Sequence, residues 1–125
     1  MPFTYQIEPT AGLLLVINTG EVTQADRLET MRAWLHDRAY QPSLNTLCDC
    51  TEAASLPSLS ELREIVGFMR THAEAIGRKK LAFLTGNQVT FAVARQFQAF
   101  LGSDPFRVEL FDDRDTALAW LREGA

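Results

Sequence analysis

Five short apolar runs alternate with four stretches of helical periodicity along this chain of 125 residues. An apolar run of roughly four to eight residues has the length of a strand, whereas apolar residues that recur every three or four positions indicate a helix. Strands that are separated by helices need crossover connections, which favour parallel pairing and right-handed crossovers. The order therefore predicts a single α/β domain over residues 1–125, with a mixed five-stranded sheet and four helices.

The first two strands are predicted to form an antiparallel hairpin, the exception in a mostly parallel sheet. Apolar and polar residues alternate over Phe3–Glu8, Pro9-Thr10-Ala11-Gly12 supplies turn residues, and Leu13–Ile17 follows directly. Every residue of Leu13–Ile17 is apolar, which is typical of a strand that is buried on both faces. The three remaining strands are predicted at Leu44–Cys50, Lys80–Thr85 and Arg107–Phe111.

The predicted helices begin at capping residues. Ser58 is followed three residues later by Glu61, a spacing that forms a capping box, and Thr23 has the same relation to Asp26. Asp112 is the predicted cap of the last helix. The residues predicted to face inward are Leu28, Met31 and Leu35 on the first helix; Leu59, Leu62, Ile65, Val66, Met69, Ala73 and Ile76 on the second; and Val89, Val93, Phe97 and Phe100 on the third, which spans Gln88–Leu101.

Two phenylalanines lie away from these inward faces. At about 100° per residue, Phe68 is turned well round on the second helix, and Phe91 lies nearly opposite Val89 and Val93 on the third. One interpretation is an exposed apolar surface that a partner covers. The other is that both helices are buried on more than one side. The first interpretation predicts a homodimer with Phe68 or Phe91 in the contact, because twofold dimers are the commonest oligomers.

The net charge of −4 opposes a nucleic-acid partner, because phosphate binding needs a concentrated basic surface. The basic run Arg78-Lys79-Lys80 precedes a predicted strand and is interpreted as a solvated strand entry. The longest apolar run, Leu13–Ile17, is too short to span a bilayer, so no membrane insertion is expected. Cys48 and Cys50 point to the same face of a strand, and we expect both to be reduced, buried thiols of a cytoplasmic protein.

No set of residues in the sequence meets the requirements of a catalytic centre, a metal site or a cofactor site. His36 and His72 lie on predicted helices, and nothing in the sequence pairs either of them with a nucleophile. The Gly86-Asn87 pair has neither the glycine spacing nor the lysine of a phosphate loop. We therefore expect no enzymatic activity, no metal and no cofactor.

Polar residues at the strand ends have two interpretations. They lie at or directly after the ends of the second, third and fourth predicted strands, and open α/β sheets place ligands at the carboxyl ends of their parallel strands. The candidates for a small ligand crevice are Gly20, Asp49, Thr51, Thr85, Gly86 and Asn87. The other interpretation is plain turn and capping chemistry.

Six segments of the chain follow one another in an order and with a spacing that are typical of one protein family. They are Glu8-Pro9-Thr10-Ala11-Gly12-Leu13, Gly20-Glu21-Val22-Thr23, Leu47-Cys48-Asp49, Lys80-Leu81-Ala82-Phe83, Phe111-Asp112-Asp113 and Ala117-Leu118-Ala119-Trp120-Leu121. On these segments, nearly the whole chain resembles the SpoIIAA-like group of the STAS superfamily, also described as STAS/SEC14-type domains.

The resemblance implies a non-enzymatic domain. STAS domains act as regulatory partners in anti-anti-sigma switching or as cytoplasmic modules of anion transporters, and the SEC14 side of the grouping carries apolar ligands. In the switching proteins, a serine within an Asp-Ser-Ser-Gly-like stretch is phosphorylated at the start of the helix after the third strand. Ser58 holds that position only approximately, the stretch is absent, and the capping box already explains the residue, so we do not expect a phospho-switch.

Three kinds of function follow from these observations. The preferred expectation is a STAS-like regulatory or protein-interaction module that forms a homodimer or binds a protein partner. The second is a carrier or sensor of a small apolar or lipid-like ligand. An anti-anti-sigma phospho-switch and an enzyme rank last.

Overall fold

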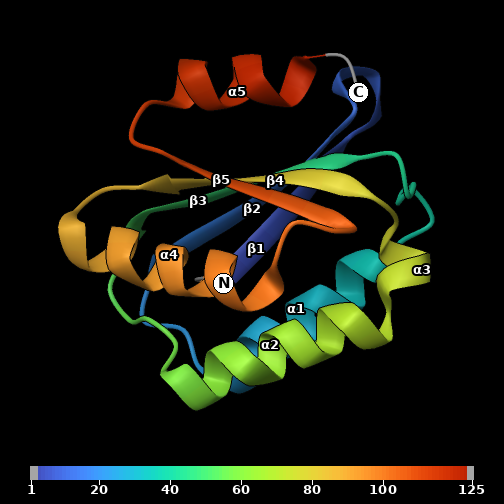
Figure 1. Ribbon diagram of the computed structural model, residues 1–125. Coiled ribbons are helices and arrows are strands. Elements are labelled where there is room, and N and C mark those ends of the chain that lie inside the picture. Colours follow the sequence, from blue (N-terminus) through green and yellow to red (C-terminus); the bar gives the residue numbers. More distant parts are fainter. Residues whose placement is uncertain (1–2, 124–125) are drawn as a thin grey trace.

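A computed structural model describes residues 3–123 and contains one five-stranded sheet with the strands in sequential order, β1-β2-β3-β4-β5 (Figure 1). The first strand pairs antiparallel with the second, and all the other pairs are parallel. This confirms the predicted α/β fold with a mixed sheet. The strands are β1 (Phe3–Glu8), β2 (Leu13–Gly20), β3 (Asn45–Ala53), β4 (Lys79–Thr85) and β5 (Phe106–Phe111).

The helices form a layer on each side of this sheet. Figure 1 shows α1 (Gln24–Leu35), α2 (Leu59–Thr71) and α4 (Gln88–Leu101) on one face and α5 (Arg114–Arg122) on the other. We call these the three-helix face and the α5 face of the sheet. None of the helices in residues 3–123 is long and apolar enough to cross a membrane.

The described residues form five α-helices, one more than predicted, because the second predicted helix is interrupted. At His72 the backbone leaves helical geometry, with φ −106° and ψ 21°, and the short helix α3 (Ala73–Ile76) begins after it. The ring nitrogen Nδ1 of His72 lies 2.9 Å from the carbonyl oxygen of Phe68, so the side chain shares the acceptor that the main chain uses at the end of α2. The apolar pattern runs through this break and could not reveal it.

The alternating side chains of β2 build two separate apolar cores. Leu14 and Val16 pack on the three-helix face, where their partners include Met31, Leu62, Val66 and Phe97. Leu13 and Leu15 pack on the α5 face with Leu47, Ala82, Leu84, Ala117 and Leu121. Both faces of β2 are thus buried, as its uninterrupted apolar run predicted.

Two of the predicted inward helix faces are turned by less than one residue, or less than about 100°, because Met31 and Phe97 are buried as predicted. On α4 the buried residues are Thr90, Ala94, Phe97 and Leu101, and the predicted inward residue Val89 is 67% exposed. On α1 they are Arg27, Met31 and Trp34. The other predicted inward residues, Leu28 and Leu35 on α1 and Val93 and Phe100 on α4, are half-buried and pack against the larger core. In both helices a polar residue occupies a buried position, which an apolar pattern passes over. On α2, Leu59 was also predicted to face inward but lies in the exposed first turn.

The helix caps follow local sequence closely. Thr23 with Asp26 and Ser58 with Glu61 both form the predicted capping boxes. The cap of α5 is Asp113 rather than Asp112, because the Asp113 carboxylate accepts hydrogen bonds from both the backbone N–H (2.9 Å) and the hydroxyl (2.7 Å) of Thr116. Asp112 is one residue too early for this spacing.

Candidate functional site

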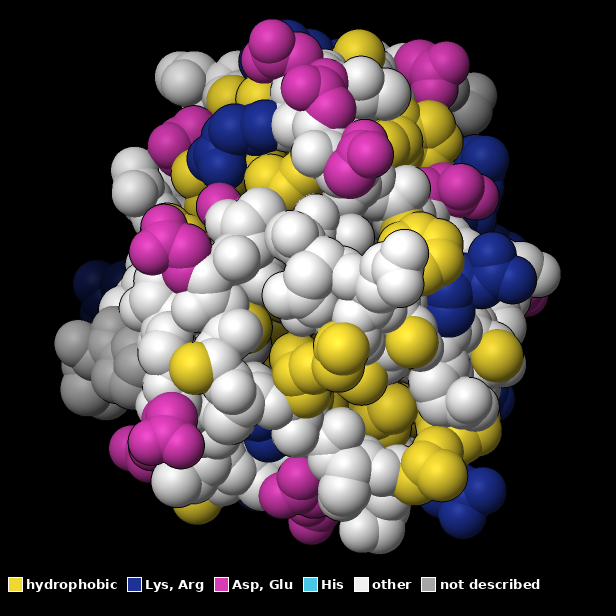
Figure 2. Space-filling view, turned by 90° about the vertical axis from the view of Figure 1, so that its left-hand side faces the viewer, with side chains coloured by type: hydrophobic (Ala, Val, Ile, Leu, Met, Phe, Trp, Pro, Cys, Tyr) yellow, Lys and Arg dark blue, Asp and Glu magenta, His cyan; other side chains and the backbone are white. Residues whose placement is uncertain are grey.

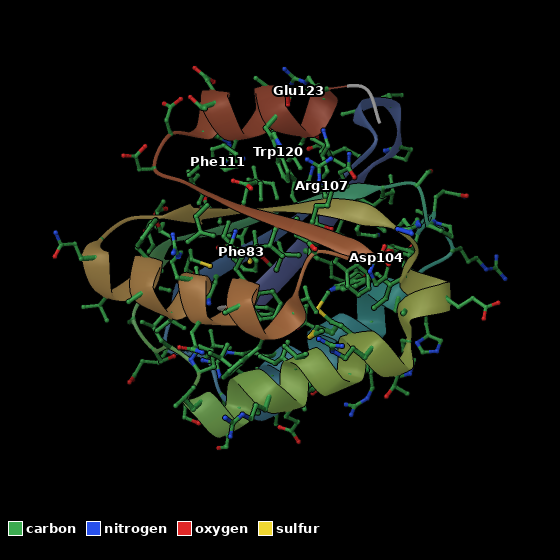
Figure 3. All side chains as sticks on the ribbon, viewed as in Figure 1. Phe83, Asp104, Arg107, Phe111, Trp120 and Glu123 are labelled. Atoms are coloured by element: carbon green, nitrogen blue, oxygen red, sulfur yellow. The ribbon has the colours of Figure 1, made fainter. Side chains whose placement is uncertain are left out.

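A cavity of about 150 Å³ lies between the three-helix face of the sheet and helices α1, α2 and α4. Its walls are mostly apolar side chains that belong to the larger core, among them Val16, Met31, Leu62, Met69, Phe83 and Phe97. Figure 3 shows Phe83 on this side of the sheet, whereas Trp120 lies between the sheet and α5. The rings of Phe83 and Phe97 meet edge to face, with their centroids 5.2 Å apart, and both residues line the cavity.

The cavity exists because small side chains stand where larger ones would fill the layer. Ala94 and Thr90 are buried on the inner side of α4, and Thr46, Cys48 and Cys50 are the residues of β3 that line the cavity. Protein interiors are ordinarily packed without voids larger than a water molecule. A concentration of small residues under one helix therefore leaves space that a ligand can occupy.

One end of the cavity is polar and carries a buried cation. Arg27, in the first turns of α1, is 4% exposed and lines the cavity. Its Nη1 donates to the side-chain oxygen of Gln24 (3.2 Å), its Nη2 donates to the carbonyl of Val22 (3.2 Å), and Glu61 lies 3.9 Å from Nη1. Burial lowers the pKa of Arg27, against the opposing effect of the Glu61 carboxylate.

Asn18 also lines the cavity, near the carboxyl end of β2. The register between β2 and β3 shifts between Ile17 and Thr19, so Asn18 sits where the parallel ladder is interrupted. The side chain is 5% exposed and lines the cavity. Within the described part of the chain, the buried side-chain atoms without a hydrogen-bond partner are Asn18 Oδ1 and Arg27 Nε. Both belong to the polar end of the cavity.

The two cysteines lie on the floor of the cavity. Their sulfur atoms are 3.7 Å apart, both thiols are free, and both residues face the three-helix side of β3, an interior strand. The predicted shared face is therefore confirmed, whereas both residues are half-buried rather than buried. The hydrogen bond with Cys50 and the burial of the sulfur raise the pKa of Cys48 well above its ordinary value. Cys48 is thus a neutral thiol at physiological pH and a poor nucleophile.

Lys79 lines the cavity at the opposite end of the sheet. Its ammonium group donates to the Tyr40 hydroxyl, which in turn donates to the carbonyl of Ile76 at 2.7 Å. Burial lowers the pKa of Lys79 to about 7 and raises the pKa of Tyr40. The predicted solvated strand entry is wrong for this residue and for Lys80, because both side chains are buried. Strand β4 begins at Lys79 and carries them into the sheet.

The predicted polar crevice is divided between the structural elements. Strand β3 continues to Ala53, three residues beyond its predicted end at Cys50, so Asp49 and Thr51 lie within the strand rather than at its end. The Asp49 carboxylate accepts from the backbone N–H (3.0 Å) and the hydroxyl (2.7 Å) of Thr51, and from Arg114 of α5 at 3.2 Å. Asp49 therefore points to the α5 face, away from the cavity.

The other crevice residues have local structural roles. The Thr85 hydroxyl donates to the Phe111 carbonyl (3.4 Å), and Asn87 caps α4 by accepting from the N–H of Thr90 (2.9 Å). An added Cβ on Gly86 would meet the Thr51 carbonyl oxygen at 2.8 Å, so this glycine permits the chain after β4 to approach the backbone of β3 closely. Gly20 ends β2 opposite Ala53. None of the six candidates lines the cavity.

The three remaining predicted residues lie at the surface or near it. Ser58 is the N-cap of α2; its hydroxyl accepts from the Glu61 N–H at 3.2 Å. Phe91 is 43% exposed. Phe68 is half-buried, packs against the larger core and lies under Arg32, with the His72 ring 4.3 Å away. The structure therefore places Phe91 at the surface and Phe68 at the edge of the core.

Sequence reasoning missed the polar end of the cavity. Arg27 lies four residues before Met31 and seven before Trp34, a helical spacing that could have marked it as inward-facing. Asn18 lies two residues after Val16, so it points to the same face of β2. Both signals were present, but polar residues are expected outside.

The described residues contain no group of three or more histidine, cysteine, aspartate or glutamate side chains that could hold a metal ion. Comparisons of this chain with models of known families, with curated proteins and with solved structures found no match.

Proposed function

We propose that this chain is a non-enzymatic domain that binds one small apolar ligand between its sheet and helices α1, α2 and α4. The observation that carries the proposal is the cavity of about 150 Å³ with apolar walls. A protein cavity of about this volume, lined by apolar side chains, stays dry and binds benzene. A ligand with an apolar body about the size of one aromatic ring therefore fits.

The polar groups around the cavity support binding rather than chemistry. The hydrogen bond with Cys50 and the burial of the sulfur keep the Cys48 thiol protonated. The adjacent residue, Asp49, points to the other face of the sheet. A nucleophile needs an adjacent base or a lowered pKa. The proposal agrees with the resemblance to STAS/SEC14-type domains, and within it the carrier or sensor function takes precedence over the interaction module.

Filling the cavity is expected to weaken ligand binding strongly without unfolding the protein. Ala94→Leu replaces a methyl group with an isobutyl group at a buried position that lines the cavity. We expect toluene to bind the native protein and to lose at least about tenfold in affinity in this variant. The matched control is Ala92→Leu, at an exposed position on the same helix, which should leave the affinity unchanged.

Titration calorimetry measures toluene binding, and thermal unfolding verifies that each variant folds. Native protein that fails to bind toluene up to its solubility limit would refute the proposed function. Unchanged toluene affinity in a folded Ala94→Leu protein would place any binding outside the cavity.

A STAS-like interaction module is the second candidate, and the exposed apolar side chains at the helix starts favour it. Both α2 and α4 begin at the edge of the sheet where the parallel strands end, and hydrophobic side chains gather over part of that face (Figures 1 and 2). Leu59, Val89 and Phe91 are 54%, 67% and 43% exposed there. A homodimer through this face would cover them, and the small net charge opposes such pairing only weakly.

Phe91→Asp should therefore convert a homodimer into a folded monomer, because a charged side chain at the centre of an apolar contact must be desolvated. Light scattering measures the mass of both proteins, and Ala92→Asp on the same helix is the control for added charge. Native protein that remains monomeric at high micromolar concentration would contradict the dimer. Phe68 is left unchanged in this experiment because it packs against the core.

A further inference from the structure

We propose that the ligand of the cavity carries a carboxyl group, which binds Arg27 and Asn18 at the polar end of the cavity. This inference rests on the binding function proposed above and specifies the chemistry of the ligand's polar end. It follows from two orphaned atoms, one buried charge and the volume of the cavity.

The polar end lacks two hydrogen-bond partners. Arg27 Nε is a donor and Asn18 Oδ1 an acceptor, and both side chains are more than nine-tenths buried. Leaving a buried polar atom without a partner destabilises a fold, and most such atoms in proteins are satisfied. Both atoms belong to side chains that line the same cavity, where a polar group of a ligand would supply the missing partners.

The charge of the site favours an anion. The carboxylates nearest to Arg27 are engaged elsewhere: Glu61 accepts from the backbone N–H of Ser58 at 2.9 Å, and Asp26 accepts from that of Thr23 at 3.2 Å. The Glu61 oxygen is 3.9 Å from the guanidinium, beyond hydrogen-bond distance. The buried positive charge is therefore only partly compensated, and a carboxylate oxygen on Nε would add a charge-assisted hydrogen bond.

A carboxyl group also suits Asn18. The side-chain amide offers an acceptor and two donors, which exchange places by a half-turn of the amide group. It can therefore donate to a carboxylate oxygen or accept from a protonated carboxyl group. An amine would place a second positive charge against Arg27, and a hydrocarbon end would leave both atoms orphaned. The apolar walls and the cavity volume limit the rest of the ligand to about the size of a phenyl ring.

Benzoate, benzyl alcohol and toluene test this inference, because they share one ring and differ only in the end group. We expect native protein to bind benzoate at least about tenfold more tightly than benzyl alcohol. Arg27→Met should weaken benzoate binding by about tenfold or more and change toluene binding by less than about threefold. Arg95→Met, at an exposed position on α4 outside the cavity lining, is the matched control and should change neither.

A second variant keeps the guanidinium in place. Glu61→Gln retains the side-chain length that a capping box needs and removes the negative charge that partly compensates Arg27. We expect it to bind benzoate about threefold more tightly and toluene as before. This variant tests whether the charge of Arg27 contributes to benzoate binding even if Arg27→Met does not fold.

The outcomes separate the two proposals. If toluene and benzyl alcohol bind but benzoate binds no more tightly, the carboxyl inference is wrong and the binding function stands. If none of the three ligands binds, both are wrong. Unchanged benzoate affinity in folded Arg27→Met, or in Glu61→Gln, also overturns the carboxyl inference.

Discussion

Gly77→Ala is expected to lower the free energy of unfolding by about 4 kcal/mol. Gly77 lies between α3 and β4 with φ 86° and ψ 163°, a backbone region that only glycine adopts readily. A Cβ added there would lie 2.6 Å from both the Cβ and the carbonyl oxygen of Pro42. Backbone strain and overpacking therefore act together, and Pro42 cannot move aside without its own backbone.

Two other glycines separate these effects. Gly102 has φ 80° and no atom within 4 Å of an added Cβ, so Gly102→Ala should show the backbone strain alone, about 1 to 3 kcal/mol. Gly67 lies inside α2 in open space, so Gly67→Ala should stabilise by about 0.5 to 1 kcal/mol. Urea denaturation of the three variants measures the change in the free energy of unfolding that each substitution causes. A Gly77→Ala protein as stable as Gly102→Ala would show that the contact with Pro42 relaxes freely.

Local signals predicted the elements whose causes are local. The capping boxes at Thr23 and Ser58, and the helix Gln88–Leu101, depend on residues within four positions of one another, and the structure has them where they were expected. The end of β3 depends on a neighbouring strand instead. Thr19 and Gly20 pair with Glu52 and Ala53, and this pairing extends β3 through polar residues that read as a loop.

The cavity could not be predicted in the same way, because it results from residues that are distant in sequence. Ala94, Thr90 and Cys50 are ordinary small residues, and only their meeting under one helix leaves space. Arg27 and Asn18 are buried because the layer closes over them, although polar residues usually lie at the surface. Neither an empty volume between elements nor a buried atom without a hydrogen-bond partner corresponds to a motif in the sequence.

Lys79→Met and Lys80→Met are expected to change stability in opposite directions. The Lys79 ammonium is buried, with the Tyr40 hydroxyl as its hydrogen-bond partner and the Tyr40 ring 4.5 Å away. Lys80 instead donates to the carbonyl of Trp120 (2.8 Å), in the last turn of α5, and to that of the C-cap residue Glu123 (3.2 Å). Figure 3 labels both acceptor residues at α5. The last carbonyls of a helix lack the donors that the helix interior provides, and a cation near a helix C-terminus stabilises the helix.

Lys79→Met should raise the free energy of unfolding at pH 7 by about 2 kcal/mol, since it removes a charge whose burial is unfavourable. Lys80→Met should lower it by about 1.5 to 3 kcal/mol, because it removes hydrogen bonds from a charged donor. The two variants are matched in size and position. Equal effects in both would show that burial of the ammonium, rather than its partners, decides the outcome.

The pH dependence of the free energy of unfolding tests the lowered pKa of Lys79 independently. Its pKa is about 7 in the folded protein and 10.5 as the ordinary value, so between these values the unfolded chain holds the proton and the folded protein does not. The free energy of unfolding then rises with pH across this window, and the cost of the buried charge is fully present below about pH 7. Urea denaturation at pH 7 and at about pH 9, below the ordinary range of tyrosine ionisation, should show this rise in native protein. Lys79→Met should lack Lys79's share of the rise and Lys80→Met should keep it; an identical rise in native protein and Lys79→Met would show that Lys79 stays charged in the folded state.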